Sequence, residues 1–296
     1  MLKILLIGSS GQIGWELTRT LMPFGQVVTP KQSELNLAQP ELLGALVNTL
    51  QPDVIVNAAA YTAVDKAEQQ RDLAFAINAV APGELAKAAR RHNALLVHYS
   101  TDYVFDGKKP VAYLEDDAPN PLNVYGCSKL AGDEAICASG ADYLILRTSW
   151  VYAARGTNFV KTILRLAGER EELRIVADQF GAPTWARLVA EVTALALHQD
   201  LPRRKSGGFD SGIFNVTAAG ETSWHGIASA IVSTARERGA TLKCRNVVPI
   251  TSAEYPVPAA RSANSRLSGG KLAKRYGLEM PGWDHCMHLC LEELFP

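Results

Sequence analysis

The first half of the chain alternates short apolar runs with helical patterns, and this alternation constrains the fold more than any other feature. The runs are almost continuously apolar, which is typical of strands that helices cover on both faces. They fall at Lys3–Ile7, Gln26–Thr29, Asp53–Asn57, Leu95–Tyr99 and Tyr143–Leu146. Between them the spacing of apolar residues predicts helices at Gln12–Met22, Pro82–Arg91 and Ser128–Ala138. The pattern predicts an α/β fold built on a doubly wound, Rossmann-type parallel sheet.

After about residue 150 the chain becomes less regular. Helical stretches are separated there by loops rich in Gly, Pro and Ser, and the proline-rich segment Pro249–Pro258 is expected to be extended. We therefore expect a dinucleotide-binding domain at 1–150 and a smaller, mainly substrate-binding lobe at 151–296. Two later segments, 174–176 and 213–216, have strand character, so the boundary is not sharp and these segments are candidates for further strands of the main sheet. In such folds the ligand site lies in the crevice at the carboxyl ends of the strands.

Charge and hydropathy exclude several classes of protein. The chain has 30 basic and 30 acidic side chains among 296 residues, so it lacks the excess of basic residues expected of a nucleic-acid binder. No apolar run approaches the roughly 20 residues that a membrane-spanning helix needs. The apolar start Met1–Ile7 runs straight into a glycine loop and is read as a buried strand rather than a signal peptide. We expect a cytoplasmic protein that binds neither nucleic acid nor membrane.

The cysteines do not predict a disulfide framework or a metal site. There are five, and no two have the C-x-x-C spacing. His285, Cys286, His288 and Cys290 crowd together near the C-terminus, but the same segment carries apolar residues at helical spacing. An amphipathic helix that packs on the core is the better interpretation.

A glycine-rich loop follows the first predicted strand and opens the first predicted helix. It reads G-x-x-G-x-x-G, with Gly8, Gly11 and Gly14 at the glycine positions. Glycines at this place permit a tight turn and let the backbone approach a pyrophosphate, whose charge then lies at the helix N-terminus. The position of the loop, more than its pattern, predicts nucleotide binding.

The choice between the two nicotinamide dinucleotides stays open. An acidic residue at the end of the second strand would bind a ribose 2′-hydroxyl and repel a 2′-phosphate. Here that strand is followed by Lys31, and the first carboxylate comes only at Glu34. Lys31 slightly favours NADP(H) over NAD(H), although a purely solvated Lys31 explains the sequence equally well.

Tyr125 and Lys129 are four residues apart, which places a phenol and an amine on one face of a helix. An isolated tyrosine has a pKa of about 10, too high for efficient proton transfer near neutral pH. A neighbouring ammonium and a positively charged nicotinamide would lower it. Thr101 comes just after the predicted strand Leu95–Tyr99, so its hydroxyl group is expected at the carboxyl edge of the sheet.

Several separate segments together resemble the extended short-chain dehydrogenase/reductase family, over nearly the full length. They are Gly8–Gly14, Asn57–Glu68, Ser100–Phe105, Pro121–Gly126, Lys129–Gly132, Arg147–Tyr152, Asp178–Thr184 and Asn264–Leu267. The later segments are much more specific than the glycine loop. The resemblance implies NAD(P)H-dependent reduction of the C4 carbonyl of a dTDP-linked sugar, dTDP-4-dehydro-β-L-rhamnose, to dTDP-L-rhamnose.

The resemblance also implies roles for individual residues. Tyr125 would protonate the sugar O4, Lys129 would bind the nicotinamide ribose and lower the pKa of Tyr125, and Thr101 would hydrogen-bond the reacting oxygen. The remaining cofactor contacts would be Gly11, Gln12 and Ile13 at the pyrophosphate, Asn36 and Leu37 near the adenosine, and Ala60, Tyr61, Thr62 and Tyr99 along the cofactor. Contacts to the sugar nucleotide would come from Thr101, Asp102, Trp150 and Arg261.

Three departures from the family pattern bear on these expectations. The position near the adenosine is Asn36 where relatives commonly carry Asp, and Ser262 replaces the proline that usually follows Arg261. Some relatives bind Mg²⁺ between subunits through glutamates. Glu16 and Glu293 match that pattern, but we place the third position at Arg187, so Mg²⁺ is disfavoured and no metal residue is predicted. The resemblance also leads us to expect a homodimer.

Two other functions are alternatives to this reductase activity. The first is a nucleotide-sugar dehydratase or epimerase on the same scaffold; dehydratases that resemble this fold carry Asp-Glu directly after the active-site Thr, whereas here Thr101-Asp102 is followed by Tyr103. A non-catalytic, cofactor-binding subunit, similar to the regulatory β subunit of methionine adenosyltransferase, is the second alternative. The presence of Thr101, Tyr125 and Lys129 together argues against it.

Overall fold

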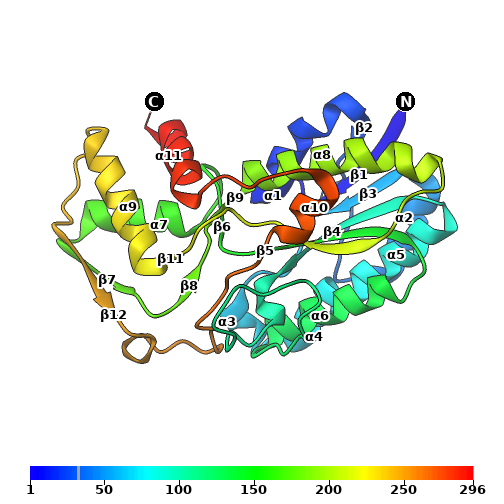
Figure 1. Cartoon of the computed structure of the whole chain (residues 1–296). Helices are drawn as coiled ribbons and strands as arrows, with labels where there is room; N and C mark the ends of the chain where they lie inside the picture. Colours follow the sequence, from blue (N-terminus) through cyan, green and yellow to red (C-terminus); the bar gives the residue numbers. More distant parts are fainter. Residues whose placement is uncertain (32–33, 296) are drawn as a thin grey trace.

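The main sheet of the molecule has six parallel strands, as the alternation of the sequence predicts. The computed structural model describes residues 1–31 and 34–295 (Figure 1). The strand order is β10-β5-β4-β3-β1-β2, and each neighbouring pair is parallel. The strands are β1 (Leu2–Ile7), β2 (Gly25–Val28), β3 (Val54–Asn57), β4 (Leu95–Thr101), β5 (Asp142–Thr148) and β10 (Gly212–Asn215). The predicted doubly wound fold is confirmed.

Helices cover both faces of this sheet because its central strands are apolar on both sides. Ile4 and Leu6 of β1 pack into one core with α1 (Gln12–Thr20), α8 (Ala186–Lys205) and α10 (Gly270–Tyr276). Leu5 and Ile7 point to the opposite face and pack into a second core with α2 (Leu43–Leu50), α5 (Ala81–Arg91) and α6 (Val124–Cys137). This alternation along one strand produces the three layers that Figure 1 shows.

Short elements connect the layers. Two short helices, α3 (Val64–Ala67) and α4 (Arg71–Phe75), follow β3, and a π-helical turn, Ala76–Val80, joins α4 to α5. Single turns of 3₁₀ helix occur at Met22–Phe24, Pro40–Leu42, Asp102–Val104 and Ser252–Glu254. The π-helical turn packs against α6, and its role in the site is described below.

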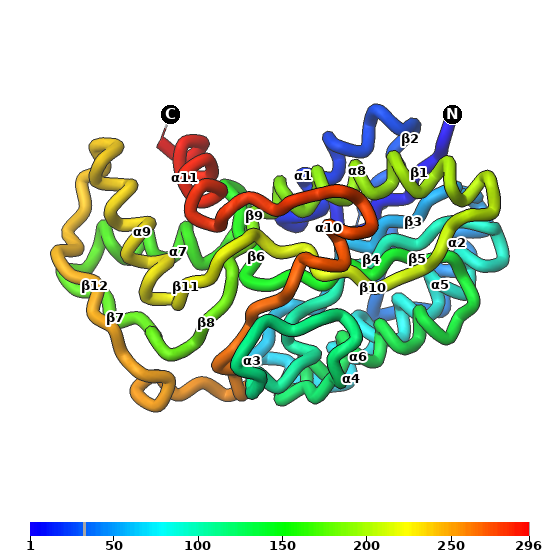
Figure 2. Tube along the Cα trace, viewed as in Figure 1, coloured from blue at the N-terminus to red at the C-terminus, as the bar shows by residue number. Residues whose placement is uncertain are grey.

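The C-terminal part forms a separate lobe with its own core. Helices α7 (Phe159–Glu169), α9 (Trp224–Glu237) and α11 (Trp283–Leu294) enclose that core, next to a two-stranded parallel sheet of β7 (Glu172–Val176) and β12 (Asn246–Ile250) (Figures 1 and 2). Four two-residue strands complete the chain: β6 (Val151–Tyr152), β8 (Phe180–Gly181), β9 (Thr184–Trp185) and β11 (Thr222–Ser223).

Three details of this part test the sequence predictions. The segment 213–216 does rejoin the main sheet, since β10 pairs with β5. The segment 174–176 does not, because β7 pairs with β12 instead, so that expectation is wrong. Pro249–Pro258 is only partly extended: Thr251 and Glu254 form a capping box, which starts a 3₁₀ turn in the middle of the segment.

The cysteine-rich C-terminal segment is a packed helix, as expected. Cys286 and Cys290 of α11 are buried in the core of the C-terminal lobe beside Met287 and Leu291, while His288 is exposed. Among residues 1–31 and 34–295, none of the helices combines the length and apolar character needed to cross a lipid bilayer.

Candidate active site

The glycine loop between β1 and α1 is held by contacts that exclude side chains. Gly8 has a φ of +85°, and a Cβ atom there would lie 2.6 Å from the Ala59 nitrogen. A Cβ at Gly14 would lie only 2.0 Å from the Gly8 carbonyl oxygen. Gly11 is the N-cap of α1, and no side chain caps the helix. The first N–H groups of α1 are therefore not used by a capping side chain, which suits a phosphate group.

The predicted residues next to this loop link it to the C-terminal lobe. The side-chain oxygen of Gln12 accepts a hydrogen bond from Asn158 Nδ2 at 3.0 Å, and Asn158 is the N-cap of α7. Ile13 packs partly buried against the first core. Gln12 thus lies where the two parts of the chain meet, which agrees with the predicted crevice.

At the expected adenosine end, the structure gives the three predicted residues different surroundings. Lys31 is exposed, while Leu37 is buried in the second core. The Asn36 side-chain oxygen accepts a hydrogen bond from the backbone N–H of Ala38 at 3.0 Å. Lys31 and Asn36 are thus exposed to solvent, whereas Leu37 is not.

The loop after β3, which holds Ala60, Tyr61 and Thr62, is fixed by an asparagine that the sequence did not single out. Asn78 of the π-helical turn accepts a hydrogen bond from Tyr61 N at 2.8 Å and donates to Tyr61 O at 3.0 Å. It also donates to Ser128 Oγ on α6, at 3.0 Å. Ala60 and Tyr61 are half-buried, and Thr62 is exposed. One buried amide therefore ties the predicted cofactor loop to the helix that carries the tyrosine and lysine.

Tyr125 lies in the first turn of α6, facing the end of β4. Asn123 caps that turn, with its side-chain oxygen accepting from Gly126 N at 2.8 Å. Burial raises the pKa of the Tyr125 phenol, and this effect outweighs the opposite effect of the nearby Thr101 hydroxyl group. Tyr103 packs edge-on against Tyr125, with ring centroids 5.4 Å apart. Tyr125 and Thr101 therefore meet as predicted, and Tyr125 is protonated at neutral pH.

Lys129 is buried one turn further along α6. Its Nζ donates to the Tyr99 carbonyl oxygen at 2.6 Å and lies 3.0 Å from His98 Nε2. Burial lowers the pKa of Lys129 to about 8, while Asp133 acts in the opposite direction. The expected lowering of the Tyr125 pKa by Lys129 and a positively charged nicotinamide stays a prediction. The lysine directs its contacts to Tyr99 and His98, and desolvation of the phenol dominates.

Tyr99 contributes to the site through its backbone. Its ring is buried in the first core, and its hydroxyl group is 2.7 Å from Thr193 Oγ1 of α8. The carbonyl group is the part that contacts Lys129. The ring fills the space between sheet and helix, and the placement of Tyr99 along the cofactor stays a prediction.

On the expected sugar side, Trp150 and Asp102 are held in unusual environments. Trp150 has a φ of +49° and stacks on Trp224, with centroids 3.9 Å apart. Burial raises the pKa of Asp102 to about 6, against the opposing effect of hydrogen bonds from Ser265 and Thr101. Because this pKa is close to neutrality, the charge of Asp102 is sensitive to pH there. Asp102 directly follows Thr101 in the chain.

Arg261 is not a free cation. Its guanidinium group pairs with Asp65 at 2.8 Å and donates to the Ala259 carbonyl oxygen at 2.9 Å. This pair attaches the C-terminal segment to the start of α3. The expected approach of Arg261 to a diphosphate would have to compete with Asp65.

The glutamates considered for a metal are bridged by an arginine. Arg187 contacts Glu16 at 3.4 Å and also pairs with Glu293. Glu191, which the sequence interpretation overlooked, lies on the same helix, and burial together with the nearby Glu16 raises its pKa. Within the described part of the chain, no group of three or more His, Cys, Asp or Glu residues is arranged to hold a metal ion.

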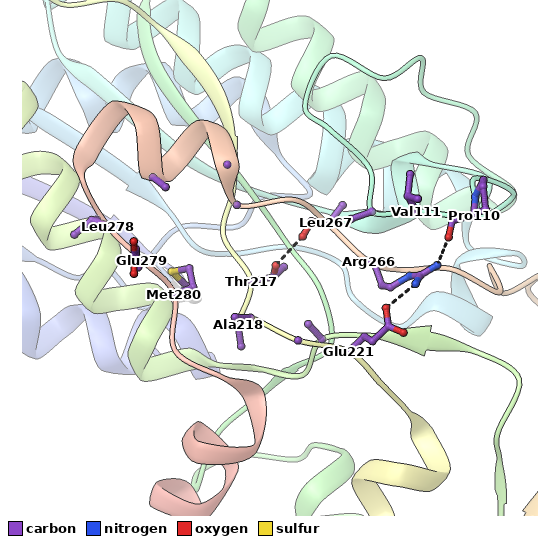
Figure 3. A pocket seen from close by; sticks show the side chains of 17 residues that line it. Pro110, Val111, Thr217, Ala218, Glu221, Arg266, Leu267, Leu278, Glu279 and Met280 are labelled. Carbon is purple, nitrogen blue, oxygen red and sulfur yellow. Dashed lines mark hydrogen bonds and ion pairs between the residues drawn. The ribbon is translucent and has the colours of Figure 1, made fainter.

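A pocket of about 560 Å³ lies elsewhere, beside the segment that follows β10 (Figure 3). It is lined by Thr217, Glu221, Arg266, Leu267 and Met280, among others. Arg266 donates to Glu221 and to the Pro110 carbonyl oxygen at its rim. None of the predicted site residues lines this pocket, so we place the active site at the Tyr125 end of the sheet.

These features define the chain as a dinucleotide-binding α/β protein with a threonine, tyrosine and lysine at the carboxyl edge of its sheet. Comparison with known proteins is more specific. The model of the RmlD substrate binding domain family matches residues 2–295. The chain belongs to this family.

Relatives with curated names are similar over almost the whole chain. A dTDP-4-dehydrorhamnose reductase of Burkholderia thailandensis is 52% identical over 99% of both chains. One from Escherichia coli K12 is 44% identical over 99% of this chain and 98% of the relative. The crystal structure of the Bacillus anthracis dTDP-4-dehydrorhamnose reductase in complex with NADP superposes with a TM-score of 0.90, at 35% identity and 99% coverage of both chains.

Proposed function

We propose that this chain is an NADPH-dependent oxidoreductase that reduces the C4 carbonyl of dTDP-4-dehydro-β-L-rhamnose to dTDP-L-rhamnose, the last step of dTDP-rhamnose synthesis. The observation that carries the proposal is the meeting of Thr101, Tyr125 and Lys129 at the end of β4. It occurs in a chain 52% identical, over its full length, to a relative named dTDP-4-dehydrorhamnose reductase. NADPH is proposed over NADH because the Bacillus anthracis relative was solved with NADP.

The reduction adds a hydride to the sugar C4 and a proton to O4. Bound NADPH supplies the hydride, and the chain supplies the proton. Tyr125 is suited to this role because burial keeps its phenol protonated. Thr101 is proposed to contact the same oxygen; its hydroxyl group donates to Asp102 Oδ1 at 3.0 Å in this structure, so its proton would turn from Asp102 to O4 when the sugar binds. Such preorganised donors stabilise the negative charge that develops on the oxygen.

Lys129 is proposed to orient the cofactor. Two of its directions are occupied by the Tyr99 carbonyl oxygen and His98, which leaves one N–H for the crevice. A hydroxyl group of the nicotinamide ribose is the partner proposed for it. Gly8, Gly11 and Gly14, together with the first turn of α1, are proposed to hold the pyrophosphate.

The proposed division of labour places the dinucleotide on residues 1–150 and the sugar nucleotide mainly on residues 151–296. Asp102 and Trp150 lie at the boundary and are proposed to contact the sugar. The stacking of Trp150 on Trp224 supports this division, because it fixes a boundary residue to the C-terminal lobe.

Two further expectations are kept as proposals. A homodimer is proposed from the resemblance to the family. Sedimentation velocity of the purified protein tests this point directly. A cytoplasmic location stays a prediction from the sequence.

The reductase proposal is tested by incubating the protein with dTDP-4-dehydrorhamnose and either NADPH or NADH. We expect stoichiometric oxidation of the reduced cofactor, faster with NADPH, and NMR identification of dTDP-L-rhamnose as the product. Turnover without net cofactor consumption would instead indicate a dehydratase or epimerase. The structure argues against that alternative, because Tyr103 packs on Tyr125 at the position where a dehydratase carries its second carboxylate.

A further inference from the structure

A chain of buried polar side chains lies behind Lys129, and the proposed mechanism does not use it. Asn57 at the end of β3 and His98 in β4 are completely buried, and Lys129 is 1% exposed. Asn57 Nδ2 is 3.1 Å from His98 Nδ1, and His98 Nε2 is 3.0 Å from Lys129 Nζ. Buried polar groups are hydrogen-bonded in the great majority of cases, because an unpaired donor or acceptor at such depth is costly.

The direction of this chain is set by a backbone amide. Ala59 N donates to Asn57 Oδ1 at 3.3 Å, and a backbone N–H can only donate. The Asn57 oxygen therefore faces Ala59, and its NH₂ group faces the imidazole ring. His98 Nδ1 must then accept a hydrogen bond, which leaves the single proton of a neutral imidazole on Nε2. Burial keeps His98 neutral, since it holds the pKa of the ring well below its ordinary value.

The Nε2–H group of His98 thus points at Lys129 Nζ. An ammonium group has three donors and no acceptor, so it would place a donor against a donor. A neutral amine has a lone pair that accepts from Nε2–H. It keeps one N–H for the Tyr99 carbonyl oxygen and one for the crevice.

We infer that His98, held as the Nε2–H tautomer by Asn57 and Ala59, is a positioning residue that sets the proton state of Lys129 and favours its neutral amine. The inference deepens the proposed reductase function and depends on it for its catalytic meaning. Reduction of each carbonyl takes up one proton from the medium. A lysine that exists partly as an amine near neutral pH can accept and release protons beside Tyr125, whereas a permanent ammonium cannot.

The charged groups around Lys129 act in both directions. Asp133, on the same helix, attracts the ammonium, but its Oδ2 also accepts from Ser100 Oγ at 2.9 Å and contacts Arg147 Nε of β5 at 3.3 Å. Arg147 thereby offsets part of the effect of Asp133. On the side of Tyr125 the titratable groups are Tyr125 itself, Asp102 and Tyr103. Burial lowers the pKa of Lys129 to about 8, and the orientation of His98 acts in the same direction.

The tautomer is measured directly by ¹⁵N NMR of histidine-labelled wild-type protein, with His98 assigned by the loss of its signals in His98→Gln. We expect the proton on Nε2 and an unprotonated Nδ1. A proton on Nδ1 would overturn the inference. This measurement needs no substitution at Asn57, so it stands even where an Asn57 variant fails to fold.

The link to Lys129 is tested with two substitutions at Asn57. In Asn57→Asp one oxygen still accepts from Ala59, and the other accepts from Nδ1–H, so Nε2 becomes an acceptor for the ammonium. The Lys129 midpoint, followed by ¹³Cε NMR, should rise by about 1 pH unit or more. Asn57→Ala removes the donor to Nδ1 without adding charge, and the midpoint should rise by less. If the Lys129 midpoint rises in Asn57→Asp but not in Asn57→Ala, the added charge alone changes the midpoint, and the proposed role of the His98 tautomer is overturned.

The matched control is Asn48→Asp. The side-chain oxygen of Asn48 lies 2.7 Å from Nε2 of the half-buried His92, so the substitution likewise places a carboxylate beside a histidine, away from the site. The Lys129 midpoint should not change in this variant. Both NMR measurements are independent of turnover. An Nε2–H tautomer in a protein without reductase activity would reject only the proposed function, and an Nδ1–H tautomer in an active reductase would reject only this inference.

Discussion

The two ends of the proposed cofactor site are built in opposite ways. At the phosphate end, Gly8 and Gly14 let two backbone segments come close together, and this contact is possible only because neither residue has a Cβ atom. At the nicotinamide end, the interior holds the polar side chains of Asn57, His98 and Lys129, and the structure depends on the match of their hydrogen-bond donors and acceptors. The first end is therefore sensitive to added volume, and the second to the placement of single protons.

Gly14→Ala tests the phosphate end and should have the largest effect. Its Cβ would lie 2.0 Å from the Gly8 carbonyl oxygen, so α1 must move. We expect the free energy of unfolding to fall by about 3 kcal/mol or more, with loss of NADPH binding. Urea denaturation and calorimetry measure these effects. Gly168→Ala is the matched control, because nothing lies within 4 Å of the new Cβ and stability should rise by up to about 1 kcal/mol. Normal NADPH binding by Gly14→Ala would contradict this account of the loop.

The pH dependence of stability tests the nicotinamide end. The pKa of Lys129 is lowered from 10.5 to about 8 in the folded chain. Between these values the unfolded chain binds more protons, so the contribution of Lys129 to the free energy of unfolding rises with pH, by about 3 kcal/mol in total. Lys129→Met lacks this contribution. Denaturation of both proteins across this range should show the wild type gaining stability relative to the variant, and parallel curves would refute the shift.

Tyr125→Phe separates proton transfer from cofactor binding. The phenylalanine keeps the ring that packs against Tyr103 but has no proton to give. We expect kcat to fall by about 100-fold or more, with little change in NADPH affinity. Steady-state kinetics and fluorescence titration measure the two quantities. Tyr255→Phe, at an exposed position, should leave both unchanged. Turnover of Tyr125→Phe within a few-fold of wild type would rule out Tyr125 as the acid.

Lys31→Ala extends the comparison to the adenosine end and should have the smallest effect. Lys31 is exposed, and an exposed charge contributes up to about 1 kcal/mol, so we expect the KM for NADPH to rise a few-fold while that for NADH is unchanged. The control, Lys205→Ala, removes another exposed lysine at the end of α8. Equal effects on the two cofactors would show that Lys31 does not contact a 2′-phosphate.

The main sheet could be predicted because its strands carry a local signal. Continuous apolar runs such as Leu95–Tyr99 correspond closely to strands that are buried on both faces. The C-terminal lobe could not be predicted in the same way. Strand β7 resembles any other strand in sequence. It pairs with β12, which lies some 70 residues later in the chain, and α9 is one of the elements between them in sequence. No local pattern encodes a pairing over that distance.

The candidate site divides along the same line. The glycine loop, Thr101, Tyr125 and Lys129 could be found from spacing and from their place after a strand, and the structure brings the last three together. Their assigned roles stay predictions. Asn78 and His98 were missed. His98 is a polar residue inside an otherwise apolar strand. Such a residue indicates a hydrogen bond in the interior, but the sequence does not identify the partner.

The hydrogen bond between Gln12 and Asn158 has a consequence for chimaeric proteins. Asn158 caps α7 with its oxygen and contacts the glycine loop with its nitrogen, so one amide serves both parts of the chain. Exchanging the C-terminal halves of two relatives would place residue 158 of one parent against residue 12 of the other. Recombined proteins should therefore inherit positions 12 and 158 from the same parent.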